Sequence, residues 1–176
     1  MNRMVADSST LILLAKCSLL KIVCELFDVI VPHTVIIEVA SEKLVKNYPD
    51  AALISGLASN GTIKVQNPGS DRPPIPLSLH RGEKDALFLA IELGRSLLAT
   101  DDGKAIRAAR FLSVPFIVTP KIVVDLFRLQ KISLEKARES LEKLSKIGRY
   151  LPEIIAEALI MLMEKKDGKT DNHKDT

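Results

Sequence analysis

The alternation of two kinds of segment along the chain is the feature that most constrains its fold. Short apolar runs recur five times, and segments with the spacing of amphipathic helices lie between them. Unbroken apolar runs of this length are typical of parallel strands that are buried on both faces of a sheet. The pattern therefore predicts an α/β fold, with a central five-stranded parallel sheet between layers of helices. The expected strands are Arg3–Ala6, Asp28–Val31, Thr62–Val65, Ser96–Ala99 and Pro115–Val118.

The remaining segments read as helices and one long loop. A single helix is expected over Thr34–Val45, and a loop over Asn67–Leu77, which holds four of the nine prolines. Thr119 followed by Pro120 is typical of a helix start after the last strand.

The length of the chain bears on its domain organisation. A chain of 176 residues suits one domain with a sizeable core and is short for two. Further helices that begin at Ser133 and Pro152 can pack on that same core. We therefore expect one domain over residues 1–166, followed by a disordered polar tail over 167–176.

Acidic residues follow two of the expected strands at their carboxyl ends. Asp7 ends the first strand, and Asp101 and Asp102 follow the fourth. Ligand sites in open parallel sheets lie beyond these ends, where the strand order reverses. If the first and fourth strands are neighbours, as in the common doubly wound orders, these acids converge.

Three more acids lie on helices that could reach the same cleft. Glu38 follows the second strand, and Glu83 and Asp85 lie at the start of the helix expected from Arg81. Two helical residues that are two positions apart differ by about 200° in direction, so Glu83 and Asp85 cannot both point the same way. Asp85 lies farther inside the helix and is the preferred candidate.

Carboxylates gathered in one cleft would repel one another. At roughly 4 Å, each like-charge pair costs about 4 kcal/mol at an effective dielectric constant of about 20. Either some are protonated or a cation lies among them. Oxygen ligands favour Mg²⁺ or Mn²⁺, and His33, His80 and His173 are too scattered for a zinc set. Such a site suits phosphoryl chemistry, because the ion activates a water and stabilises charge on the phosphate.

Each acid taken singly also has an ordinary structural interpretation. An Asp after a strand is most often a helix N-cap, which applies to Asp7 and still more to Asp102. Glu38, Glu83 and Asp85 could be first-turn acids that the helix dipole favours. The joint placement of the acids at matching ends of the pattern is what favours a functional site.

Four stretches of the sequence resemble the PIN-domain nucleases, and within them the prokaryotic VapC-like toxins. They extend from Val5 to Thr119, over most of the chain, and they match in order and spacing. The stretches are VADSSTLILLAK, VPHTVIIEV, RGEKDALFLAIELG and LLATDDGKAIRAARFLSVPFIVT.

The resemblance implies a PIN-like three-layer α/β/α fold and a metal-dependent endoribonuclease. It implies that one or two Mg²⁺ or Mn²⁺ ions are bound by Asp7, Asp85 and Asp101, with Glu38 as a ligand or as the group that orients water. Ser9 matches the family's Ser or Thr after the first Asp, placed to hydrogen-bond within the site. Similar proteins cut single-stranded RNA, many are toxins held inactive by a small antitoxin, and many are homodimers.

Two departures from the family's pattern matter. The chain is longer than a typical VapC-like toxin by the helices after Ile132, so it looks more like a poorly characterised prokaryotic PIN subgroup. It also has the doublet Asp101–Asp102 where many relatives have Asp followed by Arg. Asp102 is therefore either a further ligand or a cap.

Three basic residues follow Asp101 on one helix. Lys104 and Arg107 share a face, as do Arg107 and Arg110. They are candidates for RNA binding, but an ordinary solvated helix face explains them at least equally well. The net charge of +3 permits nucleic-acid binding without requiring it.

Two other classes of function share parts of this pattern. A haloacid-dehalogenase-like phosphatase also has an Asp after its first strand, but it needs a second acid two residues later, where this chain has Ser9. The second alternative is a non-catalytic PIN-like module that binds nucleic acid or protein. Retention of every acid position argues against this second class.

The cysteines and the hydropathy indicate the compartment. Cys17 and Cys24 lie about two helical turns apart, roughly 10 Å, which is too far for a disulfide. No secretory signal is visible, and no apolar run approaches the roughly 20 residues that span a bilayer. We therefore expect a cytoplasmic protein that does not enter a membrane.

Overall fold

The computed structural model describes residues 2–70, 72, 74 and 78–167. The chain divides into two compact units, Met1–Thr119 and Pro120–Thr176. The predicted disordered tail lies outside the described residues from residue 168 onward, as does part of the predicted loop over Asn67–Leu77.

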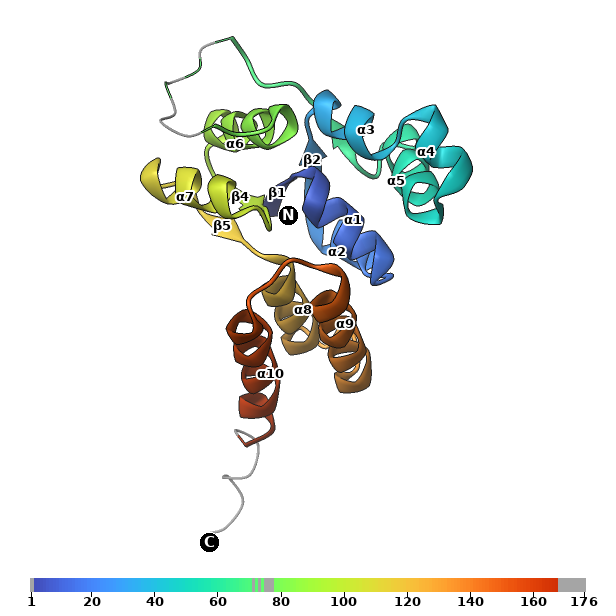
Figure 1. The fold of residues 1–176 in the computed structure, drawn as a ribbon, viewed down its shortest axis with the longest axis vertical. Helices are drawn as coiled ribbons and strands as arrows, with labels where there is room; N and C mark the ends of the chain where they lie inside the picture. Colours follow the sequence, from blue (N-terminus) through green and yellow to red (C-terminus); the bar gives the residue numbers. More distant parts are fainter. Residues whose placement is uncertain (1, 71, 73, 75–77, 168–176) are drawn as a thin grey trace, which may run out of the picture. The chain divides into compact units, whose positions relative to one another are not determined.

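A parallel sheet is the centre of the first unit (Figure 1). In the described part of the chain its five strands pair in the order β3-β2-β1-β4-β5, and every pairing is parallel. This confirms the predicted α/β fold, and it makes β1 and β4 neighbours at the point where the strand order reverses. The strands are β1 Asn2–Ala6, β2 Phe27–Val31, β3 Lys64–Val65, β4 Ser96–Ala99 and β5 Phe116–Ile117.

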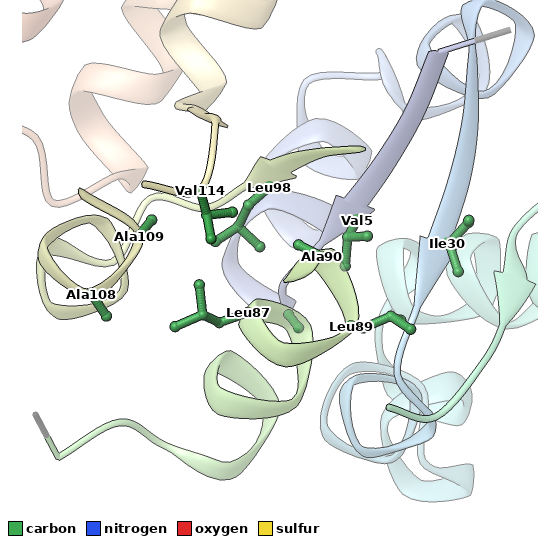
Figure 2. Packing of buried hydrophobic residues seen from close by; sticks show 10 residues of the cluster. Val5, Ile30, Leu87, Leu89, Ala90, Leu98, Ala108, Ala109 and Val114 are labelled. Carbon is green, nitrogen blue, oxygen red and sulfur yellow. The ribbon is translucent and has the colours of Figure 1, made fainter. Parts of the chain in front are cut away.

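The register of the central strands creates one apolar face. Val5 of β1 is paired with Ile30 of β2 on one side and with Leu98 of β4 on the other. These side chains pack with residues of α6 (Arg81–Leu93) and α7 (Gly103–Phe111), as Figure 2 shows. The residues from the two helices include Leu87, Leu89, Ala90, Ala108 and Ala109.

The opposite face of the sheet is buried as well. Met4, Val29 and Ala99 lie next to Val5, Ile30 and Leu98 along their strands and so point to this opposite face. Each has at most 1% of its surface exposed. Burial on both faces explains why the strands read as unbroken apolar runs. The other helices of this unit are α1 Ser8–Lys16, α2 Leu20–Leu26, α3 His33–Val39, α4 Glu42–Asn47 and α5 Pro49–Ser59.

The direction of α6 brings its first turn to the carboxyl edge of the sheet. The helix contacts β1 and β4 and leads into β4 through Gly94. Gly94 has a φ of 69°, a left-handed conformation that glycine adopts without the penalty of a side chain. Because the helix runs against the strands, its N-terminus lies where β1 and β4 end.

The single helix predicted over Thr34–Val45 is wrong, because two helices occupy this segment. α3 ends at Val39 and α4 begins at Glu42. Ser41 between them has an extended backbone and occupies the N-cap position of α4. Serine favours such positions over a helix interior, since its hydroxyl competes for backbone hydrogen bonds.

The second unit is helical. It contains α8 (Thr119–Arg128, which begins at the last residue of the first unit), α9 (Leu134–Ile147) and α10 (Pro152–Asp167). The Ser133 hydroxyl accepts a hydrogen bond from the Lys136 N–H at 3.1 Å and so caps α9, which contacts α10. None of the helices in the described part of the chain has the length and apolar composition that crossing a membrane requires.

Candidate functional site

Asp7 extends the pairing of β1 with β4 and then starts α1. Its N–H donates to the carbonyl of Ala99 at 3.1 Å. Its Oδ1 accepts from the Ser9 hydroxyl at 2.8 Å and from the Thr10 N–H at 2.9 Å, and its Oδ2 accepts from the Thr100 hydroxyl. Asp7 is therefore the N-cap of α1, as its structural interpretation predicts, while its second oxygen faces the neighbouring strand.

Burial dominates the electrostatics of Asp7. Only 1% of its surface is exposed, and this burial raises the pKa of its carboxyl group from 3.8 to about 6. Hydrogen bonds from Thr10, Thr100 and Ser9 lower the pKa, and the nearby charge of Asp101 raises it. The charged form of Asp7 is thus disfavoured by its surroundings.

Asp101 lies next to Asp7, at the end of β4. Its Oδ1 accepts from the Thr119 N–H at 2.8 Å, and its Oδ2 accepts from the Thr119 hydroxyl and, at 3.2 Å, from the Thr10 hydroxyl. Thr10 therefore donates to both acids, from its backbone to Asp7 and from its side chain to Asp101. The order of the strands brings these two acids together as the sequence predicts.

Asp102 serves as the N-cap of α7. Its Oδ1 accepts from the Lys104 N–H at 2.7 Å and from the Ala105 N–H at 2.9 Å. Asp102 therefore caps α7 through Oδ1, and its role as a further ligand stays a prediction. The same carboxylate is close enough to Glu83 to raise the pKa of that residue.

Glu38 approaches the site from α3. It is exposed, and its carboxylate accepts from the Ser8 hydroxyl of α1 and, at 3.1 Å, from the Gly82 N–H of α6. Glu38 thus links α3 to the beginnings of two other helices.

Glu83 forms a capping box with His80 at the start of α6. Its Oε2 accepts from the His80 N–H at 3.0 Å. Burial is the main cause that raises the pKa of Glu83, with smaller contributions from Asp102 and Glu38, while His80 lowers it.

One pocket collects three of these carboxylates. It has a volume of about 410 Å³ and is lined by Asp7, Glu38 and Glu83 together with Ser8, Ser9, Ile12 and His80. Asp101 and Asp102 influence its acids, Asp101 through Asp7 and Asp102 through Glu83. The carboxyl edge of β1 and β4 is therefore an acidic region.

Asp85 lies in a different pocket from Asp7, so the expected single cleft for all the acids is not observed. Only 5% of Asp85 is exposed, and its carboxylate accepts from the Thr34 hydroxyl at 2.9 Å and pairs with Arg72 at 2.7 Å. This second pocket, of about 260 Å³, also contains His33 and Arg81. The separation follows from the position of Asp85 two residues after Glu83, since α6 turns by about 200° between them.

The pocket lined by Asp7, Glu38 and Glu83, called the acidic pocket below, has donor groups that suit a hard cation. Its ligands are carboxylate and hydroxyl oxygens, which Mg²⁺ and Mn²⁺ prefer. Within the described residues, however, no group of three or more His, Cys, Asp or Glu side chains is gathered closely enough to hold a metal ion. The acids surround the pocket, each held by its own hydrogen-bond donors.

The residues that sequence reasoning missed are mostly hydroxyls. Thr10, Thr100 and Thr119 are completely buried and hold Asp7 and Asp101. Thr10 follows Asp7 closely in the sequence and Thr100 directly precedes Asp101, so their proximity to the acids could have been predicted. Thr119 lies 18 positions from Asp101, and its proximity could not have been predicted in this way.

The basic residues predicted to bind RNA lie on the surface of α7. Lys104, Arg107 and Arg110 are all exposed. The Arg110 guanidinium lies 5.5 Å from the centre of the Phe116 ring. Exposure agrees with both interpretations, a phosphate-binding track and a solvated helix face.

Comparisons with known proteins agree with this geometry. No curated protein matches the chain. A model of the family described as the PIN domain matches residues 3–165, which is most of the chain. PIN domains are generally nucleases, which indicates nucleic acid as the substrate class, and they typically use divalent metals. With its five-stranded parallel sheet and the acids at the β1–β4 edge, the chain belongs to the PIN domain family.

Proposed function

We propose that the protein is a metal-dependent endoribonuclease that hydrolyses RNA phosphodiester bonds at the acidic pocket. The observation that supports this most is the buried Asp7 carboxylate beside Asp101, at a pocket shared with Glu38 and Glu83. Among the described residues, no ion pair reaches Asp7, Glu38 or Glu83. Charge on these three acids is costly without an ion pair, and a divalent cation would offset that cost.

In this proposal the carboxylates have different roles. Asp7 and Asp101 would bind Mg²⁺ or Mn²⁺, and Glu38 would bind it or orient the attacking water. The ion, when bound, supplies an activated water and stabilises charge on the phosphate. On α6, Glu83 already lines the acidic pocket. Asp85 could contribute to it only after breaking its hydrogen bond to Thr34 and its ion pair with Arg72.

The finer parts of the proposal rest on the resemblance to VapC-like toxins. They are the choice of RNA as the nucleic acid, a toxin role with a small antitoxin as partner, and a homodimer. The exposed Lys104, Arg107 and Arg110 on α7 support a path for a phosphate backbone.

The test is an RNA-cleavage assay with wild type and Asp7→Asn, in Mn²⁺ and in EDTA. Wild type should cleave only with the ion. Asp7→Asn should lose cleavage and keep its circular-dichroism spectrum, because an amide can replace the hydrogen bonds to Ser9, Thr10 and Thr100. Asp50→Asn, in the first turn of α5, is the matched control and should cleave like wild type. Undiminished cleavage by Asp7→Asn, or activity in EDTA, contradicts the proposal.

A non-catalytic nucleic-acid-binding module is the alternative, and one observation favours it. Each candidate acid has hydrogen-bond donors of its own, so the arrangement is stable without an ion. The cleavage assay and melting curves with and without Mn²⁺ decide between the two, because a module of this kind does not cut RNA and gains no stability from Mn²⁺.

A further inference from the structure

The backbone conformation at Gly82 does not require a glycine. This residue lies buried in the first turn of α6, and its φ is not in the left-handed region, so any residue could adopt its conformation. Glycine in a helix carries an entropic cost relative to alanine. The reason for this glycine must therefore lie in its neighbours.

The neighbour that excludes a side chain at this position is Glu38. A Cβ atom on residue 82 would lie 2.5 Å from Oε2 of Glu38, 2.8 Å from its Oε1 and 2.9 Å from its Cδ. The three nearest atoms all belong to this one carboxylate, which comes from a different helix.

The close approach lets the backbone of α6 hold the carboxylate. The Gly82 N–H donates to Oε1 of Glu38 at 3.1 Å, and the Ser8 hydroxyl donates to its other oxygen. Glu38 is otherwise an exposed side chain with several free torsions, so these two donors fix where its charge lies.

We propose that Gly82 is a positioning residue, which leaves room for the Glu38 carboxylate to lie against the start of α6 at the edge of the acidic pocket. This inference rests on the proposed function of that pocket. A methyl group at position 82 would displace only the end of a flexible side chain, so it should move Glu38 without disturbing the fold.

The primary variant is Gly82→Ala. Its melting temperature without metal should equal or exceed that of wild type, because alanine has the higher helix propensity. Its RNA cleavage in Mn²⁺ should fall on the order of 10- to 100-fold, as expected when a group in a reacting site is displaced by about 1 Å. The rise in melting temperature that Mn²⁺ produces should also become smaller.

A matched control and a rescue separate positioning from a general effect of the substitution. Gly56→Ala also adds a methyl group to a helical glycine, in α5, where the new Cβ meets nothing within 4 Å, and it should cleave like wild type. In the Glu38→Asp background, whose side chain is one methylene shorter, Gly82→Ala should reduce cleavage far less than it does in wild type.

The outcomes distinguish this inference from the proposed function. Wild type that neither cleaves RNA nor gains stability from Mn²⁺ overturns both. A wild type that is active, with Gly82→Ala equal to it, overturns the role of Gly82 alone. A lower melting temperature for Gly82→Ala would mean that the glycine serves the stability of the fold, and it overturns the inference. The same holds if Gly82→Ala reduces RNA cleavage as much in the Glu38→Asp background as in wild type.

Discussion

At the scale of single residues, hydroxyl groups determine how the acids at the strand ends are held. Thr10 donates to both Asp7 and Asp101, and Thr100 and Thr119 supply further hydrogen bonds. Each buried hydroxyl satisfies a carboxylate oxygen without neutralising its charge. The acids are therefore ordered and still carry an electrostatic cost.

The pH dependence of stability should reveal that cost at Asp7. Its pKa is 3.8 before folding and about 6 in the folded protein, so the folded state holds the proton more tightly. The stability due to this proton is fully present below about pH 3.8 and is lost as the pH rises through about 6, a loss of about 3 kcal/mol. Urea unfolding in EDTA should show Asp7→Asn gaining on wild type between about pH 4 and pH 7. Parallel pH profiles for the two proteins would contradict this assignment.

The sequence identified the acids more readily than their partners. Asp7 and Asp101 stand directly after apolar runs, so their place at a sheet edge follows from strand pairing. The ion pair of Arg72 with Asp85 joins a proline-rich loop to a helix face, and no periodicity in the sequence predicts such a contact. Long-range pairs of this kind depend on packing that only the assembled fold defines.

At the scale of secondary-structure elements, burial explains which predictions succeeded. The central strands are buried on both faces, so their apolar runs were unambiguous. The helix predicted over Thr34–Val45 is interrupted after Val39, and Ser41 occupies the N-cap position of the next helix. The extended backbone at Ser41 separates the two helices, although the hydrophobic pattern continues beyond it.

The two acids of α6 should respond differently to substitution. Glu83→Gln should lower the stabilisation by Mn²⁺, since Glu83 lines the pocket of Asp7 and Glu38. Asp85→Asn should leave that stabilisation in place and lower the free energy of unfolding by about 1–2 kcal/mol, because it weakens the ion pair with Arg72. Chemical denaturation with and without Mn²⁺ measures both quantities. The reverse pattern would assign the ion to Asp85, the acid preferred from the sequence.

At the scale of the whole molecule, all the candidate residues belong to one unit. The resembling stretches end at Thr119, and the first unit ends at the same residue. The helices that make this chain longer than a typical VapC-like toxin lie in the second unit, although the family match continues to residue 165. The proposed chemistry therefore depends on the first unit, and the second requires a separate explanation.

Metal binding is the property of the whole molecule that tests the proposal most directly. An ion that binds only the folded state stabilises it by about 2.7 kcal/mol at 100 times its dissociation constant. For a chain of 176 residues this corresponds to a rise in melting temperature of about 5–10 °C. Differential scanning calorimetry should show this rise with Mn²⁺ or Mg²⁺ at about pH 7.5, and a smaller rise at about pH 5, because protons compete for carboxylates such as Asp7. Asp7→Asn should show little of the rise at either pH, and an equal rise in that variant would place the ion elsewhere in the protein.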